Sequence, residues 1–272
     1  MHLFVEGHGI RTIALLGVVQ WLEQTGKTRD VRSVTCYSFG SIIGVAMALK
    51  RAPREVVERV LRSAISKTTR IGAVLCTALS SHRARMSRSL RDEIEAIVPR
   101  GMTLARLKEH TGVDVRILVV ALDEGRTVTL DAAGNPGVLV ADAVLASCSI
   151  PSLFDPVSIG GARYVDGGAL GGFHEPVPRD STVLVMEPFD SFTVCGNESA
   201  LTTYYLLMNR HRTRWLRRAR RAGARVVAVE ATATTPVGAS EAECNELFAR
   251  GFIVASDHFG GGLCGLRGFG LP

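Results

Sequence analysis

Short apolar runs alternate with longer segments of helical periodicity along most of this chain. Runs typical of buried strands cover His2 to Glu6, Val31 to Cys36, 182–187 and 224–230. Between the first two runs, apolar residues recur at helical spacing until Gly26, a residue that suits the end of a helix. This order favours parallel strands joined by helices. We therefore predict a three-layer α/β/α fold with a mainly parallel central sheet, and expect residues 1–272 to form a single domain.

The composition is that of an ordinary globular protein. The chain has 272 residues, of which 46% are apolar and 21% charged, so it can bury a core of its own. None of its six cysteines forms a Cys-x-x-Cys pair. A zinc or thioredoxin-type site is therefore unsupported, and we expect reduced thiols in a cytoplasmic protein. The first residues do not resemble a signal peptide, and no apolar stretch reaches the roughly 18 residues of a membrane-spanning helix.

The stretch "VTCYSFGSIIG", residues 34–44, places Ser38 where an apolar strand becomes an apolar helix. A sharp turn at such a junction exposes a serine hydroxyl at the carboxyl end of the strand, and the following helix dipole favours negative charge there. The turn needs small residues two places on either side of the serine. Gly40 meets this need, and Cys36 meets it in part. Taken alone the pattern is weak, because a serine in this position is more often a helix cap.

A glycine-rich segment, "EGHGIRT" at residues 6–12, joins the first expected strand to the first expected helix. Backbone amides of Gly7, His8 and Gly9 can turn toward one point there, which describes an oxyanion hole. Arg11 could steady the loop or the developing charge. Two other interpretations are a simple strand-to-helix turn and a phosphate-binding loop, although neither G-x-G-x-x-G nor a Walker lysine is present.

An aspartate, Asp166, ends another expected strand and is followed by Gly167 and Gly168. Its carboxylate can approach another backbone closely and could accept the Ser38 proton directly, as a Ser–Asp dyad without histidine. Because the reference pKa of aspartate is about 3.9, such a base must be partly desolvated. The plain alternative is an ordinary Asp-Gly turn.

The stretch "ASCSIPSLFDPVSIGGARYVDGG", residues 146–168, resembles the corresponding stretch of patatin-like phospholipases. The first strand, glycine-rich loop and first helix are also similar to that family, as is the segment 246–259 to its terminal helix. The order of loop, elbow and Asp-Gly-Gly agrees. Residues 65–115 and 190–235 carry little of the resemblance.

The resemblance implies a serine acyl hydrolase that cleaves carboxylic ester bonds of glycerolipids or phospholipids. Ser38 would be the nucleophile and Asp166 its general base. The amides of Gly7, His8 and Gly9 would hold the oxyanion, with Arg11 matching the family's basic residue. The resemblance implies no metal and no organic cofactor.

The sequence also departs from the family pattern. His8 and Thr12 replace glycines of the loop, and Cys36 replaces the first glycine of the elbow. Tyr37 and Phe39 replace small residues, and could line an acyl groove or block it. One alternative is therefore a catalytically weak or inactive lipid-binding protein on the same fold. Another is a serine esterase that does not act on lipids.

Histidine could replace the aspartate as the base. The imidazole of His8 could lie beside Ser38, although a loop of this kind usually directs the side chain away. His174, His211 or His258 could complete a Ser–Asp–His triad of the α/β-hydrolase type. That fold usually has several strands before its elbow, whereas Ser38 follows only one or two, so we favour the dyad.

Residues 209–225, "NRHRTRWLRRARRAGAR", are strongly basic in a chain of net charge +6. A basic amphipathic helix with an aromatic residue can lie on an anionic membrane or bind nucleic acid, or it can be a solvated face. For a lipid hydrolase we expect peripheral association with an anionic membrane, and we do not expect a nucleic-acid partner. The candidate membrane-surface residues are Arg214, Trp215, Arg217, Arg218 and Arg221.

Overall fold

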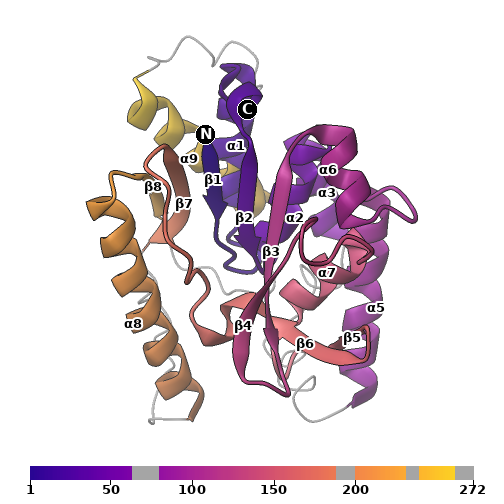
Figure 1. The fold of residues 1–272 in the computed structure, drawn as a ribbon. Helices are drawn as coiled ribbons and strands as arrows, with labels where there is room; N and C mark the ends of the chain where they lie inside the picture. The colour runs from indigo at the N-terminus through magenta and orange to yellow at the C-terminus, as the bar shows by residue number, and fades with distance from the viewer. Residues whose placement is uncertain (63–79, 188–199, 231–238, 261–272) are drawn as a thin grey trace.

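The computed structural model describes residues 1–62, 80–187, 200–230 and 239–260 (Figure 1). Its centre is one sheet, which in the described residues has eight strands in the order β5-β6-β3-β2-β1-β7-β8, with β4 paired to β3. The strands are β1 (His2–Val5), β2 (Ser33–Tyr37), β3 (Asp114–Ala121), β4 (Arg126–Leu130), β5 (Val157–Ile159), β6 (Ala162–Asp166), β7 (Ser181–Glu187) and β8 (Arg225–Glu230).

Strands β1, β2, β3, β7 and β8 pair in parallel, whereas β4, β5 and β6 are antiparallel to their neighbours. The described helices are α1 (Ile13–Gln24), η1 (Lys27–Asp30), α2 (Phe39–Ala48), α3 (Pro53–Arg62), α5 (Ser80–Ile97), α6 (Leu104–Thr111), α7 (Val140–Cys148), η2 (Gly167–Leu170), α8 (Ala200–Arg221) and α9 (Glu241–Phe259). Helices flank the sheet, so the predicted three-layer arrangement with a mainly parallel sheet is confirmed.

Alternate residues of each central strand enter two different cores, as the period of a strand requires. On one face, Val5, Cys36 and Leu184 pack in the large cluster formed with α1, α2, α7 and α9. On the other face, Phe4 packs with Trp215 and other side chains of α8. Helix α8 therefore covers the opposite side of the sheet from α1 and α9.

Residues 81–91, a basic and polar segment of the sequence, lie inside the helix α5. Met86, Leu90 and Ile94 recur every four residues along this helix and are buried, so its apolar face anchors an otherwise polar segment. The short edge strand β5 was not anticipated.

Within the described ranges, no helix is both long enough and apolar enough to span a membrane. The cysteines that the structure describes, Cys36, Cys148 and Cys244, are buried free thiols. Cys76, Cys195 and Cys264 lie outside the described residues.

Candidate active site

Ser38 occupies a strained turn between β2 and α2. Its backbone has φ 52° and ψ −141°, a conformation that costs a non-glycine residue energy and persists only where the surroundings impose it. The Ser38 N–H donates to Ser147 Oγ at 2.9 Å, and the Ser38 carbonyl accepts the Ser41 hydroxyl at 2.6 Å. The Ser38 side chain makes no helix-capping hydrogen bond. The helix-cap interpretation of this serine is therefore wrong.

Glycines allow the turn to approach the first loop closely. A Cβ on Gly7 would lie 2.6 Å from Ser38 Cβ, and a Cβ on Gly40 would lie 2.4 Å from the Val5 carbonyl oxygen. Cys36 is accommodated because Gly44 faces it, where a Cβ would be 3.0 Å from the Cys36 sulfur. Cys36 also lies within strand β2, without a positive φ. This position therefore does not require glycine.

The register of the sheet brings Asp166 next to the elbow. Tyr37, the last residue of β2, pairs with Leu118 of β3. On the other side of β3, Val119 pairs with Asp166, the last residue of the antiparallel strand β6. Both strands thus end at the same level on either side of β3. Ser38 and Asp166, which are far apart in sequence, lie close enough for their side chains to interact.

The Asp166 carboxyl is buried, with 4% of the residue exposed. Oδ1 accepts the Gly168 N–H at 2.7 Å, while Oδ2 is buried and has no hydrogen-bond partner among the described residues. Burial raises the pKa of Asp166 to about 7, although the nearby Ser38 side chain and the hydrogen bond from the Gly168 amide lower it in part. The site therefore contains a buried carboxyl, with its pKa raised toward neutral pH, near the Ser38 side chain.

The loop of residues 7–11, called here the glycine loop, lies against this pair. Gly9 has φ 56°, which favours glycine. The His8 N–H donates to Thr12 Oγ1 at 2.7 Å, so this amide is already engaged inside the loop. The His8 ring contacts Glu6, with Nε2 2.8 Å from Oε1. Arg11 is buried at the junction with α1, and burial lowers its pKa.

These contacts favour Asp166 over the histidine alternatives. The His8 imidazole is directed to Glu6. His174 is exposed, and so is His211, which lies beside Gly171 at the end of η2. Burial and the charge of Arg225 lower the pKa of His258 on α9. Among the described side chains, the one whose hydrogen bonding shifts the pKa of Asp166 is Ser38.

A sequence profile of the family described as patatin-like phospholipase matches residues 3–181. This chain belongs to that family. The matched range contains the glycine loop, the elbow and Asp166, but not α8, β8 or α9.

Solved structures show the same fold over nearly the whole chain. VipD from Legionella pneumophila has a TM-score of 0.61 at 12% identity, over 95% of this chain and 66% of VipD. ExoU of the Pseudomonas aeruginosa type III secretion system, in its heterodimeric complex with SpcU, has a TM-score of 0.53 at 22% identity, over 96% of this chain and 51% of the other. This chain therefore spans about two thirds of VipD and about half of ExoU. No curated protein sequence matches it.

The bulky residues of this patatin-like elbow are buried in the two cores. Tyr37 is buried against Phe173, with ring centroids 4.9 Å apart, and its hydroxyl donates to Glu6 Oε2 at 3.3 Å. Phe39 packs in the large core. The glycines at 168 and 172 leave room for the Tyr37 ring.

The prediction that Trp215 lies on a membrane-binding surface is wrong. It is 3% exposed, packs between Phe4 and Phe173, and its Nε1–H donates to the Glu175 carbonyl. The side chain is therefore part of the core and cannot enter a membrane. Arg214, Arg217, Arg218 and Arg221 are exposed on α8. These four residues are called the basic face.

Sequence reasoning missed three contributors to the site. Ser147 supports the elbow, because its hydroxyl accepts the Ser38 N–H and donates to the Leu118 carbonyl at 2.7 Å. Glu6 and Arg212 form a buried ion pair beneath the glycine loop. Ser147 sits inside the family-like stretch and Glu6 directly precedes the loop, so both had a weak signal. Arg212 was one arginine among many.

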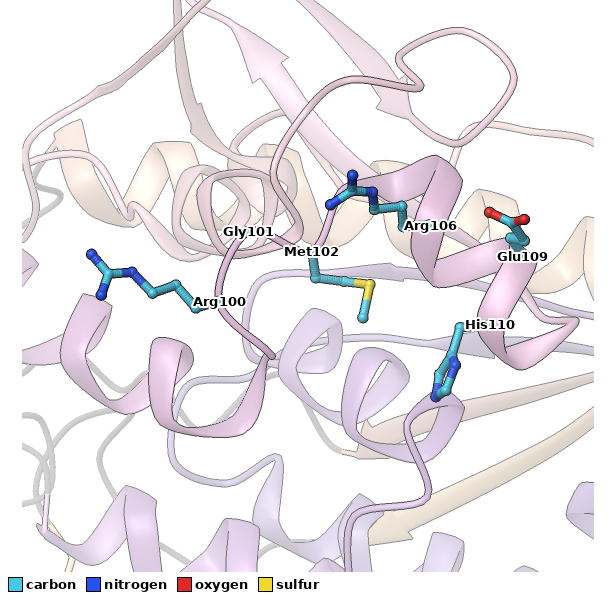
Figure 2. Close-up of a pocket in the computed structure, with 6 residues that line it drawn as sticks. All are labelled: Arg100, Gly101, Met102, Arg106, Glu109 and His110. Atoms are coloured by element: carbon cyan, nitrogen blue, oxygen red, sulfur yellow. The ribbon is translucent and has the colours of Figure 1, made fainter.

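Two neighbouring hollows, both lined in part by Arg100, Gly101 and Met102, lie away from the elbow. One, of about 500 Å³, is lined by the side chains shown in Figure 2. Those residues are Arg100, Gly101, Met102, Arg106, Glu109 and His110. Helix α6 leads into the start of β3, so this hollow lies at the amino edge of the sheet, away from Ser38. In the part of the chain that the structure describes, no group of three or more His, Cys, Asp or Glu side chains could hold a metal ion.

Proposed function

We propose that this protein is a serine acyl hydrolase that cleaves carboxylic ester bonds of glycerolipids or phospholipids through Ser38 and Asp166. The observation that carries the proposal is the pairing of a strained, uncapped Ser38 with a buried carboxyl whose pKa is raised by burial to about 7. A base with a pKa near the working pH combines a large ionised fraction with useful basicity.

The first half-reaction forms an acyl-enzyme. Asp166 Oδ2 takes the proton of the Ser38 hydroxyl while Ser38 Oγ attacks the ester carbonyl carbon. The resulting oxyanion would be held by amides of Gly7 and Gly9, near the amino end of α2. Asp166 then gives the proton to the leaving alkoxide, and the C–O bond of the ester breaks. Arg11 is proposed to steady the loop.

The second half-reaction restores the enzyme. Water replaces the departed alcohol, and Asp166 takes one of its protons as the oxygen attacks the acyl carbon. The tetrahedral intermediate collapses with release of a fatty acid, and the proton returns from Asp166 to Ser38 Oγ. Every proton that moves is carried by one carboxyl, so no histidine is needed.

A catalytically silent lipid-binding protein is the second candidate, and the His8 amide favours it. In an active loop this amide would be a further oxyanion donor, but here Thr12 Oγ1 accepts it. Loss of one such donor typically costs about 3 kcal/mol of transition-state stabilisation. A slow enzyme is compatible with that loss, because two other amides remain in the loop.

The test combines a covalent probe with product analysis. The wild-type protein is incubated with a fluorophosphonate and, separately, with mixed phospholipid vesicles. We expect one phosphonylated peptide, containing Ser38, and release of free fatty acid with a lysophospholipid, both measured by mass spectrometry. Vesicle binding without labelling or release would instead establish the silent binder. Release from short soluble esters alone would establish an esterase that does not act on lipids.

We also propose that the basic face of α8 binds anionic membrane surfaces. Its four arginines repeat at spacings of three and four residues, so they share one side of the helix. In the described structure, no acidic side chain forms an ion pair with any of them. Such a face gains about 1 kcal/mol per arginine near an anionic surface.

Replacing all four arginines of the basic face by glutamine should weaken binding to phosphatidylserine-containing vesicles at least about tenfold, as measured by co-sedimentation. Binding to phosphatidylcholine vesicles should change little. The matched control replaces four exposed arginines elsewhere, Arg100, Arg106, Arg126 and Arg163, and alters net charge by the same amount. Equal losses in both proteins would show that only net charge matters, and no loss in either would remove the proposal.

A further inference from the structure

Glu6 is a buried carboxylate at the point where β1 enters the glycine loop. Its side chain is 1% exposed, and Gly7 follows it directly. Oε1 accepts the Met186 N–H at 2.7 Å and lies 2.8 Å from His8 Nε2. Oε2 accepts the Tyr37 hydroxyl at 3.3 Å. One carboxylate therefore joins the loop, the residue before Ser38 and the end of β7.

Arg212 completes this cluster from α8, which covers the face of the sheet where Phe4 and Tyr37 are buried. Its Nε donates to Glu6 Oε2 at 2.7 Å, and its Nη2 donates to Glu6 Oε1 at 2.7 Å. Nη2 also donates to the Met186 carbonyl at 2.6 Å. The planar guanidinium thus grips both carboxylate oxygens, a geometry that lysine cannot reproduce.

The pair is charged as well as buried. Burial by itself raises the pKa of Glu6, but the charges of Arg212 and His8 and their hydrogen bonds outweigh it, so the pKa falls to about 2. A buried pair of this kind adds little net stability compared with apolar residues of similar size, whereas removing one partner is strongly destabilising. Stability alone therefore does not account for its presence at this position.

The pair lies where the glycine loop approaches the nucleophile. Gly7 lies so close to the elbow that a Cβ on it would be 2.6 Å from Ser38 Cβ and 2.7 Å from the Phe39 nitrogen. A small displacement of Glu6 would carry Gly7 with it. In a reaction that depends on aimed amides, a misplacement of 1 Å can cost about 100-fold in rate.

We propose that Arg212 is a positioning residue that acts through Glu6, holding the glycine loop where its amides face the oxygen of an ester bound at Ser38. The inference rests on the proposed function. It assigns a role in the reaction to α8, which lies outside the range matched by the family profile. The competing explanation is that Arg212 only neutralises a buried charge.

A double-mutant cycle separates the two explanations, with kcat and KM measured on a soluble nitrophenyl ester so that membrane binding does not intervene. We expect Glu6→Gln and Arg212→Met each to lower kcat roughly 10- to 100-fold, with KM within about twofold. Because Arg212 acts through Glu6, the double variant should be no slower than the slower single variant. Its melting temperature should recover relative to Arg212→Met, since no unpaired charge remains.

Arg220→Met is the matched control, because Arg220 forms an exposed ion pair with Glu187 between the same helix and the same strand. It should leave kcat unchanged. A double variant with the kcat of the wild type would overturn the inference. So would a double variant whose loss in kcat equals the product of the losses in the two single variants. Should Arg212→Met fail to fold, Arg212→Lys and the double variant give the same comparison. A wild-type protein without turnover or probe labelling overturns the proposed function, and this inference with it.

Discussion

Replacing Ser38 by alanine is expected to abolish fluorophosphonate labelling and to lower kcat for ester hydrolysis by roughly 10⁴-fold or more. The hydroxyl is the atom that attacks, and the other groups of the site act only around it. Alanine keeps a Cβ in the same backbone conformation, φ 52° and ψ −141°. The melting temperature of the alanine variant should therefore stay within a few degrees of the wild type.

Ser38→Gly tests whether the elbow is strained, as distinct from merely reactive. Glycine adopts positive φ without the Cβ penalty, so Ser38→Gly should be inactive, yet more stable than Ser38→Ala by about 1 to 3 kcal/mol. Denaturant unfolding of the two variants measures the difference. Ser158→Ala, on the exposed edge strand β5, is the control for loss of a hydroxyl. Turnover close to wild type in Ser38→Ala would eliminate the dyad.

The sequence predicts the layers of this fold because the central parallel strands are short apolar runs and the helices beside them have apolar faces. It does not predict the partner of an edge strand. Antiparallel β6 pairs with β3 at Val119 and Asp166, a register chosen by long-range packing. That register brings Asp166 to Ser38, so the spacing of the two residues in sequence could not predict their proximity.

The candidate site was predicted where local geometry leaves a sequence signal, and missed where the contacts are made by side chains distant in sequence. Gly7, Gly40 and Gly167 are required by close backbone approach, which makes them visible as a pattern. Arg212 resembles its exposed neighbours in sequence, and only its burial against Glu6 distinguishes it. Trp215 was misplaced because an aromatic residue among arginines fits a membrane surface and a core equally well.

Asparagine at position 166 is expected to lower kcat/KM by roughly 10²- to 10⁴-fold, the usual loss when a general base is removed. Asn Oδ1 can still accept the Gly168 N–H, so the turn should keep its shape. In the wild-type protein, kcat/KM should rise with pH to a plateau, with a midpoint near 7 set by the pKa of Asp166. The residual activity of Asp166→Asn should lack this step.

Asp166→Asn, which lowers activity, should raise stability, by an amount that increases with pH. Burial raises the pKa of Asp166 from 3.8 to about 7, so the folded protein binds this proton more tightly than the unfolded chain does. The stability contributed by the protonated carboxyl is complete below pH 3.8 and is lost as pH rises through about 7. The loss amounts to roughly 4 kcal/mol at pH 8.5. Asparagine stays neutral at every pH, so Asp166→Asn avoids this loss of stability.

We therefore expect the unfolding free energies of wild type and Asp166→Asn to agree near pH 4 and to diverge in favour of the variant up to pH 8.5. Urea denaturation across this range measures the divergence. Asp155→Asn is the control, because the Asp155 side chain is 43% exposed and pairs with Arg83. The unfolding free energy of this control variant should stay parallel to that of the wild type over the same pH range. A constant difference between wild type and Asp166→Asn at every pH would mean that Asp166 is ionised at its ordinary pKa. Such a carboxylate would be too weak a base to activate Ser38, because its affinity for a proton would be about three orders of magnitude below that of a group with a pKa near 7.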